Sequence, residues 1–118
     1  MQLKQLLLIL LLLPLLSCSQ DKVGSQAYEV MLNSLLSHTV NEVYVKNQNS
    51  NTTKYVYLDA RELSEYNVSH IENAIWVGYD DFDLKRVDSI DKIKPIIVYC
   101  SVGYRSEKIS ENLLKAGF

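Results

Sequence analysis

The sequence contains few of the residues from which metal sites, phosphate-binding loops and nucleic-acid surfaces are built. Its 118 residues include two Cys and two His, and His38 and His70 stand far apart, so no metal-ligand cluster is expected. The four Gly form no phosphate-binding fingerprint. The net charge is −2, with both signs spread along the chain, and no basic stretch indicates binding to nucleic acid. The chain also lacks internal repeats, and its length is enough for one domain.

The N-terminal residues predict the compartment. The apolar run 6–16 is too short to cross a bilayer and has the length of a signal-peptide core. The sequence Leu-Leu-Ser-Cys at 15–18 follows at once and resembles a bacterial lipobox. This resemblance implies a signal peptide over 1–17, lipidation of Cys18, a tether over 18–25, and a protein anchored by lipid in the bacterial cell envelope, on the periplasmic side or at the outer membrane. An ordinary signal peptide and an uncleaved anchor are the alternatives.

Hydrophobic periodicity predicts alternating helices and strands. It predicts a helix over 26–37 and a strand over 39–45, and a polar surface loop is expected over 47–53. The further elements are expected in this order: a strand over 54–58, a short helix over 62–66, a strand over 74–77, a partly helical crossover over 80–90, a strand over 95–99 and a final helix that ends at Gly117. Strands that alternate with helices are typical of a parallel α/β sheet.

Cys100 stands where the last predicted strand ends and the last predicted helix begins. A short loop in this position gathers backbone N–H groups around one point, and the helix dipole adds partial positive charge there. Such settings lower a cysteine pKa to roughly 3.5–7.5, so a thiolate is expected near neutral pH. Arg105 would add a full positive charge, and Gly103 would free the backbone to turn inward. A buried, inert cysteine is the alternative.

Cysteine usage supports the reactive interpretation. If Cys18 carries lipid, Cys100 is the one free thiol left. Because an oxidising compartment favours paired cysteines, an unpaired one there is either buried and inert or kept for chemistry.

Four segments together resemble the rhodanese-like sulfurtransferases. The loop 100–106 has the form Cys-x-x-Gly-x-Arg-Ser of the family's active-site loop. Residues 57–62 resemble the Leu-Asp-x-Arg strand end of the family, and residues 65–75 resemble its Glu-Tyr-x-x-Gly-His-Ile-x-Gly-Ala-Ile signature. The pair Gly-Phe at 117–118 resembles the one that closes the helix after the catalytic loop.

The resemblance implies an α/β fold, a rhodanese-like parallel sheet flanked by helices, over residues 26–118, with the motif match starting at about residue 54. Ser69 and Asn73 stand where glycine is common, and Asn73 is expected to tolerate a left-handed backbone. In this family a further strand, a Gly-Gly turn and a Trp-bearing segment follow the Gly-Phe pair. The sheet is therefore expected to be C-terminally incomplete, as in a fragment, a truncated gene product or a domain to which a partner supplies the strand.

The resemblance also implies roles for single residues. Cys100 is the expected catalytic residue, and Arg105 is expected to orient the donor's anionic part or to hold the loop. In the family's pattern His70 is a structural residue rather than a base. From the residue types alone, Asp59 could be catalytic but is expected to support the site by capping a helix or pairing with an Arg, and Arg61 is expected to be its ion-pair partner or a packing residue. Tyr104 is expected to shape the mouth of the pocket. The anion would be bound by the loop residues Ser101, Val102, Gly103, Tyr104, Arg105 and Ser106.

These roles predict a sulfurtransferase that carries sulfane sulfur as a persulfide on Cys100, from thiosulfate or a persulfide donor to a thiol or cyanide-like acceptor, without a cofactor. Family members suited to thiosulfate carry extra cationic loop residues, where this chain has Ser101 and Val102. Phosphatase-type and arsenate-type loops on the same fold have five residues between Cys and Arg, whereas this loop has four, which disfavours that chemistry. A non-catalytic binding module with an unknown protein partner is the other alternative.

The lipobox resemblance generates a first test. Replacing Cys18 with Ser should release the protein from the membrane fraction into the soluble envelope fraction, because the residue that would carry the lipid is gone. Fractionation after a high-salt wash measures this. Retention of the Cys18→Ser protein with membranes would contradict lipid anchoring through this residue.

Overall fold

The structure is a computed structural model, and it describes residues 24–45 and 54–118. The predicted signal peptide, the lipidation site Cys18, most of the tether and the predicted surface loop over 47–53 lie outside the described residues. No helix within the two described ranges is long and apolar enough to span a bilayer. The chain divides into two units, residues 1–30 and 31–118.

Helix α2, Gln26–Leu35, confirms the first predicted helix. The Ser25 hydroxyl accepts a hydrogen bond from the Tyr28 N–H at 3.4 Å, as expected for an N-cap. At the other end, the Leu36 N–H donates to the Leu32 carbonyl at 2.9 Å. No residue of α2 is buried, so its apolar residues add nothing to a core.

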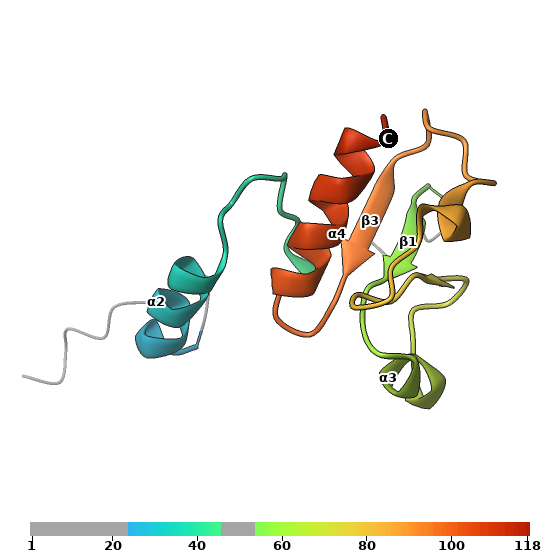
Figure 1. The fold of residues 1–118 in the computed structure, drawn as a ribbon. Helices are drawn as coiled ribbons and strands as arrows, with labels where there is room; N and C mark the ends of the chain where they lie inside the picture. The colour runs from blue at the N-terminus through green and yellow to red at the C-terminus, as the bar shows by residue number, and fades with distance from the viewer. Residues whose placement is uncertain (1–23, 46–53) are drawn as a thin grey trace, which may run out of the picture. The chain divides into compact units, whose positions relative to one another are not determined.

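The sheet has three strands, β1 (Val56–Asp59), β2 (Ile75–Trp76) and β3 (Ile96–Tyr99), in the order β2-β1-β3. Figure 1 labels β1 and β3, which lie side by side. Both strand pairs are parallel, which confirms the predicted parallel α/β arrangement. β1 is the central strand, and its burial increases from a half-buried first residue to three buried ones. The three strands match the ranges predicted over 54–58, 74–77 and 95–99 to within two residues.

The register aligns the carboxyl ends of all three strands. Asp59 pairs with Trp76 on one side and with Tyr99 on the other. Hydrogen bonds extend the ladder beyond the last pair, because the Ala60 N–H donates to the Tyr99 carbonyl at 2.9 Å and the Val77 N–H donates to the Asp59 carbonyl at 3.0 Å. The residues that follow each strand therefore meet at one edge of the sheet.

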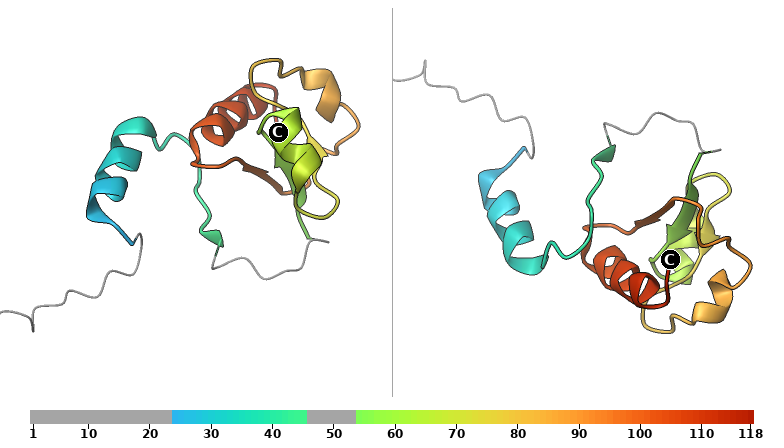
Figure 2. Two further views of the ribbon diagram at one scale, coloured as in Figure 1. Left: turned by 90° about the horizontal axis from the view of Figure 1, so that it is seen from below. Right: turned by 90° about the horizontal axis from the view of Figure 1, so that it is seen from above.

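Helices flank the sheet. The short helix α3 spans Leu63–Val68, the 3-10 helix η3 spans Leu84–Val87, and the long helix α4 spans Tyr104–Lys115. Figure 2 shows α4 and η3 on the same side of the sheet. These elements confirm the short helix, the partly helical crossover and the final helix that the sequence predicted.

The C-terminus of α4 has the predicted glycine stop. Gly117 has a φ of 89°, and its N–H donates to the Leu114 carbonyl at 3.1 Å. The Phe118 N–H donates to the Leu113 carbonyl at 3.1 Å, which completes a Schellman motif. Phe118 also packs against the core, as the residue after such a glycine commonly does.

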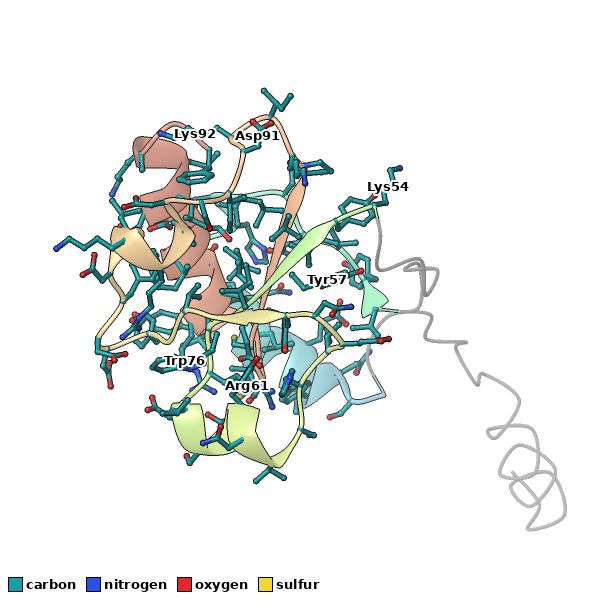
Figure 3. The ribbon with its side chains drawn as sticks, turned by 90° about the vertical axis from the view of Figure 1, so that its right-hand side faces the viewer. Lys54, Tyr57, Arg61, Trp76, Asp91 and Lys92 are labelled. Carbon is teal, nitrogen blue, oxygen red and sulfur yellow. The ribbon has the colours of Figure 1, made fainter. Side chains whose placement is uncertain are left out.

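The core lies between the sheet and α4, where side chains fill the space seen in Figure 3. The strands contribute Leu58, and α4 contributes Ile109 and Leu113. Small and β-branched side chains complete the packing. The buried members of this cluster are Leu58, Ala60, Val77, Val87, Ile90, Ile109 and Leu113.

The strand predicted over 39–45 is wrong, because this segment pairs with no strand in the described part of the chain. It is held by α4, where the buried Glu107 carboxylate accepts hydrogen bonds from the Ser37 N–H at 3.0 Å and the Thr39 N–H at 3.2 Å. Burial raises the pKa of Glu107, but these backbone hydrogen bonds outweigh it and lower the pKa. Val45 is 89% exposed, so the alternation of residue types in this segment does not correspond to a buried strand face.

The two departures from the family's glycine pattern have different backbone conformations. Asn73 has a φ of 61°, which confirms that asparagine occupies a left-handed position here. Ser69 has a φ of −165°, an extended conformation open to any residue. Glycine is therefore not required at Ser69, and Asn73 replaces it at the position where left-handed backbone is needed.

Two neighbouring leucines of α4 test the position of the core. Leu113→Ala should lower the free energy of unfolding by about 2–5 kcal/mol, because Leu113 is buried and its removal leaves a cavity. Leu114→Ala is the matched control and should cost at most about 0.5 kcal/mol, because Leu114 is 58% exposed. Urea denaturation measures both, and equal losses would contradict the packing of this helix face.

Candidate active site

Cys100 directly follows β3, and its sulfur lies inside the turn that leads to α4. The Gly103 N–H lies 3.1 Å from Sγ, and the Ser106 N–H lies 3.4 Å from it. Gly103 has a φ of 101°, in the left-handed region that favours glycine, and this conformation lets the chain turn from the loop into α4. Cys100 is a free thiol, half-buried, close to the N-terminal end of α4. The structure thus has the strand–loop–helix arrangement that the sequence predicted.

The loop favours the thiolate form of Cys100. Burial raises the pKa of the thiol, but hydrogen bonding with Ser106 and with the backbone N–H groups of Val102 and Gly103 outweighs burial and lowers the pKa below 9.0. The Ser106 hydroxyl lies 3.5 Å from Sγ and 2.9 Å from the Gly103 carbonyl oxygen, so it can donate to one of them at a time. The amide donors are fixed by the turn, and the hydroxyl is the adjustable one.

Arg105 forms an ion pair with Glu65 on α3. Its Nη1 lies 2.9 Å from Oε2 of Glu65, and its Nη2 lies 3.3 Å from Oε1. The hydrogen bond with Arg105 is the largest contribution that lowers the pKa of Glu65, to about 2. Arg105 was expected either to orient the donor or to hold the loop, and these contacts favour the second role.

Glu65 begins the segment 65–75 that resembles the family signature, but the sequence pattern predicts no function for it. Its partner Arg105 is 40 residues away along the chain, so spacing alone does not pair them. A local signal was present, because Glu62 and Glu65 form the capping box at the start of α3. The capping box fixes the carboxylate of Glu65, whose Oε2 accepts from the Glu62 N–H at 3.0 Å.

Asp59 and Arg61 form an ion pair, which is one of the arrangements that their residue types suggested. The Nη2 of Arg61 lies 2.6 Å from Oδ2 of Asp59, which is fully buried. Burial raises the pKa of Asp59, but hydrogen bonds from Arg61 and Tyr99 outweigh it and lower the pKa. Nη2 of Arg61 also donates to the Ser69 carbonyl at 2.7 Å, and the guanidinium lies 5.5 Å from the Tyr99 ring centre. Arg61 therefore joins the end of β1 to the segment after α3.

Trp76 lies near Arg61, as Figure 3 shows. Its Nε1 donates to the Arg61 carbonyl at 2.9 Å, and the Arg86 guanidinium lies 4.4 Å from its ring centre. Trp76 thus has a structural role in holding the end of β2.

His70 lies at the same pocket as Cys100 but is held by α3. Its ring stacks on Tyr66 at a centroid distance of 3.8 Å and an interplanar angle of 10°. Its Nδ1 lies 2.9 Å from the Tyr66 carbonyl oxygen, which acts as an acceptor, so Nδ1 carries a proton. These contacts fix the ring, and within the described residues no hydrogen bond links it to Cys100.

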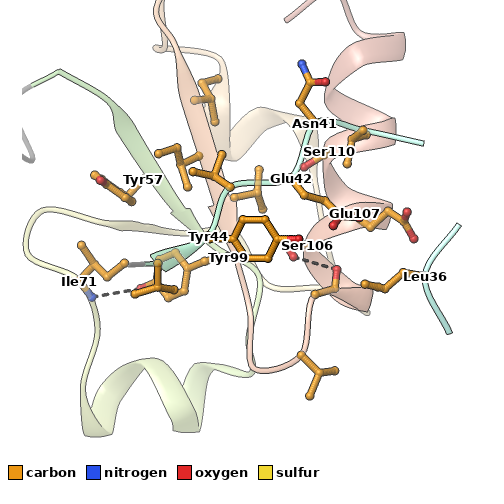
Figure 4. A pocket seen from close by; sticks show the side chains of 18 residues that line it. Leu36, Asn41, Glu42, Tyr44, Tyr57, Ile71, Tyr99, Ser106, Glu107 and Ser110 are labelled. Atoms are coloured by element: carbon orange, nitrogen blue, oxygen red, sulfur yellow. Dashed lines mark hydrogen bonds between the residues drawn. The ribbon is translucent and has the colours of Figure 1, made fainter. Parts of the chain in front are cut away.

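Cys100 opens into a pocket of about 320 Å³. A larger pocket of about 560 Å³, shown in Figure 4, lies next to the Cys100 loop and is lined by Val102, Gly103 and Ser106 from that loop. The two share Ile71 and Tyr99, whose N–H and hydroxyl are 3.1 Å apart. The thiol lines the smaller pocket, together with Arg61, Ser69, His70, Ile71, Tyr99 and Ser101.

Tyr104 is not among the lining residues of these two pockets, and its role at the pocket mouth stays a prediction. Its position as the first residue of α4 places its ring against Tyr79, edge to face, at a centroid distance of 6.3 Å. Within residues 24–45 and 54–118, no group of three or more His, Cys, Asp or Glu could hold a metal ion.

Comparisons with known proteins agree with this geometry. The family model of the rhodanese-like domain matches residues 39–118, more than half of the chain. Among curated relatives, the tRNA uridine(34) hydroxylase of Hamiltonella defensa is 38% identical over 89 residues, which cover 71% of this chain and 23% of that protein. No solved structure matches the chain significantly.

Further relatives carry the same name. The tRNA uridine(34) hydroxylases of Yersinia enterocolitica and Yersinia pestis are each 43% identical over 68 residues, which cover 53% of this chain and 19% of each relative. The chain therefore spans about a fifth of the length of the curated relatives that it matches.

The hydrogen bonds to the sulfur generate a test at Ser106. Ser106→Ala removes the hydroxyl and keeps the amide, so the pKa of Cys100 should rise, and alkylation by iodoacetamide near neutral pH should slow. The pH profile of the alkylation rate measures the pKa. Ser110→Ala on the same helix is the control and should leave the profile unchanged. An unaltered profile in Ser106→Ala would mean that the amides alone stabilise the thiolate.

Proposed function

The chain belongs to the rhodanese-like domain family, and we propose that it is a sulfurtransferase that carries sulfane sulfur as a persulfide on Cys100. The observation that carries the proposal is a free thiol whose sulfur lies 3.1 and 3.4 Å from two loop amides. These amides stabilise negative charge on the sulfur, both as the thiolate and as the persulfide anion. The lowered pKa of Cys100 supports a nucleophilic role.

The reaction proceeds in two steps. The Cys100 thiolate attacks the sulfane sulfur of a donor, a new S–S bond forms, and the donor's S–S bond breaks with its electron pair on the leaving group. A nucleophilic acceptor, such as a thiol or cyanide, then attacks the outer sulfur of the persulfide, and the Cys100 thiolate is regenerated. The small pocket at Cys100 suits a sulfur donor of limited size.

The size of the loop favours sulfur over phosphate or arsenate chemistry. Four residues separate Cys100 from Arg105, one fewer than in phosphatase-type loops. In addition, Arg105 binds Glu65, whereas a phosphoryl group calls for a free guanidinium to bind its oxygens. Both features support a site for a sulfur atom rather than for a tetrahedral oxyanion.

The relatives act, by their name, on uridine 34 of tRNA, and this chain spans about a fifth of their length. Our proposal therefore rests on the Cys100 loop and not on their hydroxylation reaction. We also propose that the reaction takes place in the bacterial envelope on a lipid-anchored protein, and the support for this is the apolar run over 6–16 followed by Cys18.

The two cysteines of the chain provide a matched test. After exposure to thiosulfate or to cysteine persulfide, mass spectrometry should find one added sulfur atom on Cys100, and transfer to cyanide should produce thiocyanate. Cys100→Ser should abolish the sulfur adduct and the thiocyanate, because a hydroxyl does not form a persulfide. The change is nearly isosteric, so the melting temperature should stay the same. Cys18→Ser should retain both in a soluble preparation.

One result would contradict the proposal that the chain is an enzyme. If the wild type forms no persulfide on Cys100 with any sulfane donor but binds a partner protein, the chain is a non-catalytic rhodanese-like binding module.

A further inference from the structure

Each of the two arginines nearest to Cys100 has its own carboxylate. Arg61, which lines the Cys100 pocket, binds Asp59 with contacts of 2.6 to 3.2 Å from Nε and Nη2. Arg105 binds Glu65 through both terminal nitrogens. The four ionised side chains sum to zero, and the thiolate of Cys100 then leaves a net negative charge at the sulfur.

Glu65 also binds the hydroxyl of Ser101, the loop serine that lines the Cys100 pocket. The Ser101 hydroxyl donates to Oε1 of Glu65 at 3.2 Å and accepts from Nη2 of Arg105 at 3.2 Å. Glu65, Arg105 and Ser101 thus form a closed set of hydrogen bonds, and the Glu62 N–H holds the same carboxylate from α3. Neither the guanidinium nor the hydroxyl is free to bind a sulfonate oxygen.

The charge balance distinguishes two classes of sulfur donor. Thiosulfate brings two negative charges to a pocket that already holds the thiolate, and in the described residues Arg61 is the only Lys or Arg that lines it. An organic persulfide, R–S–SH, brings one negative charge or none from its sulfur. Repulsion between like charges in a partly buried site therefore disfavours thiosulfate much more than the persulfide.

We propose that Glu65 is a specificity-determining residue, which keeps Arg105 and Ser101 occupied and makes an organic persulfide the donor in preference to thiosulfate. This inference rests on the proposed function. In the favoured step the Cys100 thiolate attacks the outer sulfur of R–S–SH, and the R–S–S bond breaks. The thiolate R–S⁻ leaves with the electron pair, and the transferred sulfur keeps its proton as Cys100–S–SH.

Glu65→Gln tests the proposal, because it removes the charge and keeps groups that can bond to Arg105 and Ser101. The measurement is kcat/KM for thiosulfate and for cysteine persulfide. In cysteine persulfide the charges of the ammonium and the carboxylate cancel. Wild type should prefer the persulfide. In Glu65→Gln the ratio of the thiosulfate value to the persulfide value should rise about tenfold, since the released charge of Arg105 attracts the dianion more strongly.

Glu62→Gln is the matched control. Glu62 belongs to the same capping box, is more exposed and lies 3.9 Å from Arg105, so its ratio should change less than about twofold. The ratio is the informative quantity because any change in the reactivity of Cys100 itself affects both donors.

Three outcomes would decide against the proposal. A wild-type preference for thiosulfate would overturn it while leaving sulfur transfer intact. An equal fall of kcat/KM for both donors in Glu65→Gln would make Glu65 a positioning residue without a role in donor selection. If the ratio of the thiosulfate to the persulfide kcat/KM rose as much in Glu62→Gln as in Glu65→Gln, the effect would come from net charge alone. Failure of the wild type to form a persulfide with either donor would instead overturn the proposed function.

Discussion

The parallel pairing of β1 with β3 is the constraint on which the site depends. Because the two strands run in the same direction and in the register Asp59 to Tyr99, the residues that follow them emerge at one edge of the sheet. Asp59 ends β1 there and holds Arg61, while Cys100 follows β3 in the next position. A register shift of one residue would turn every side chain of the shifted strand to the opposite face and separate these groups.

The first turn of α4 is the second organising feature, because it joins three segments of the chain. Arg105 binds Glu65 on α3, and Ser106 contributes its amide and hydroxyl to the sulfur. Glu107 faces the segment before Val40 and satisfies its backbone N–H groups. Across the described residues, no buried side-chain nitrogen or oxygen atom lacks a hydrogen-bond partner. Helix α4 thus places the positive end of its dipole near the sulfur, and its first turn also holds the neighbouring segments in place.

Local sequence signals predicted the elements where burial and turn chemistry agree. The β-branched run before Cys100 is a strand, and the glycine at 117 ends the last helix in a left-handed conformation. Asn73 takes the left-handed conformation expected of it. The prediction failed over 39–45, because alternating residues specify a strand only when another strand lies within hydrogen-bonding reach. There the backbone instead bonds to Glu107, a partner 68 to 70 residues away.

The sequence by itself determined the position of Cys100 and the form of its loop, because a strand end, a glycine and a helix start are local features that place amides around Cys100 whatever surrounds them. Tertiary structure alone decided how the charges near that loop are arranged. The pairing of Arg105 with Glu65, and the edge-to-face contact of Tyr104 with Tyr79, depend on where separate segments come together in space. Hydrogen bonds and ion pairs act over a few ångströms, so residues distant in the chain acquire partners only once the sheet and α4 have brought their segments together.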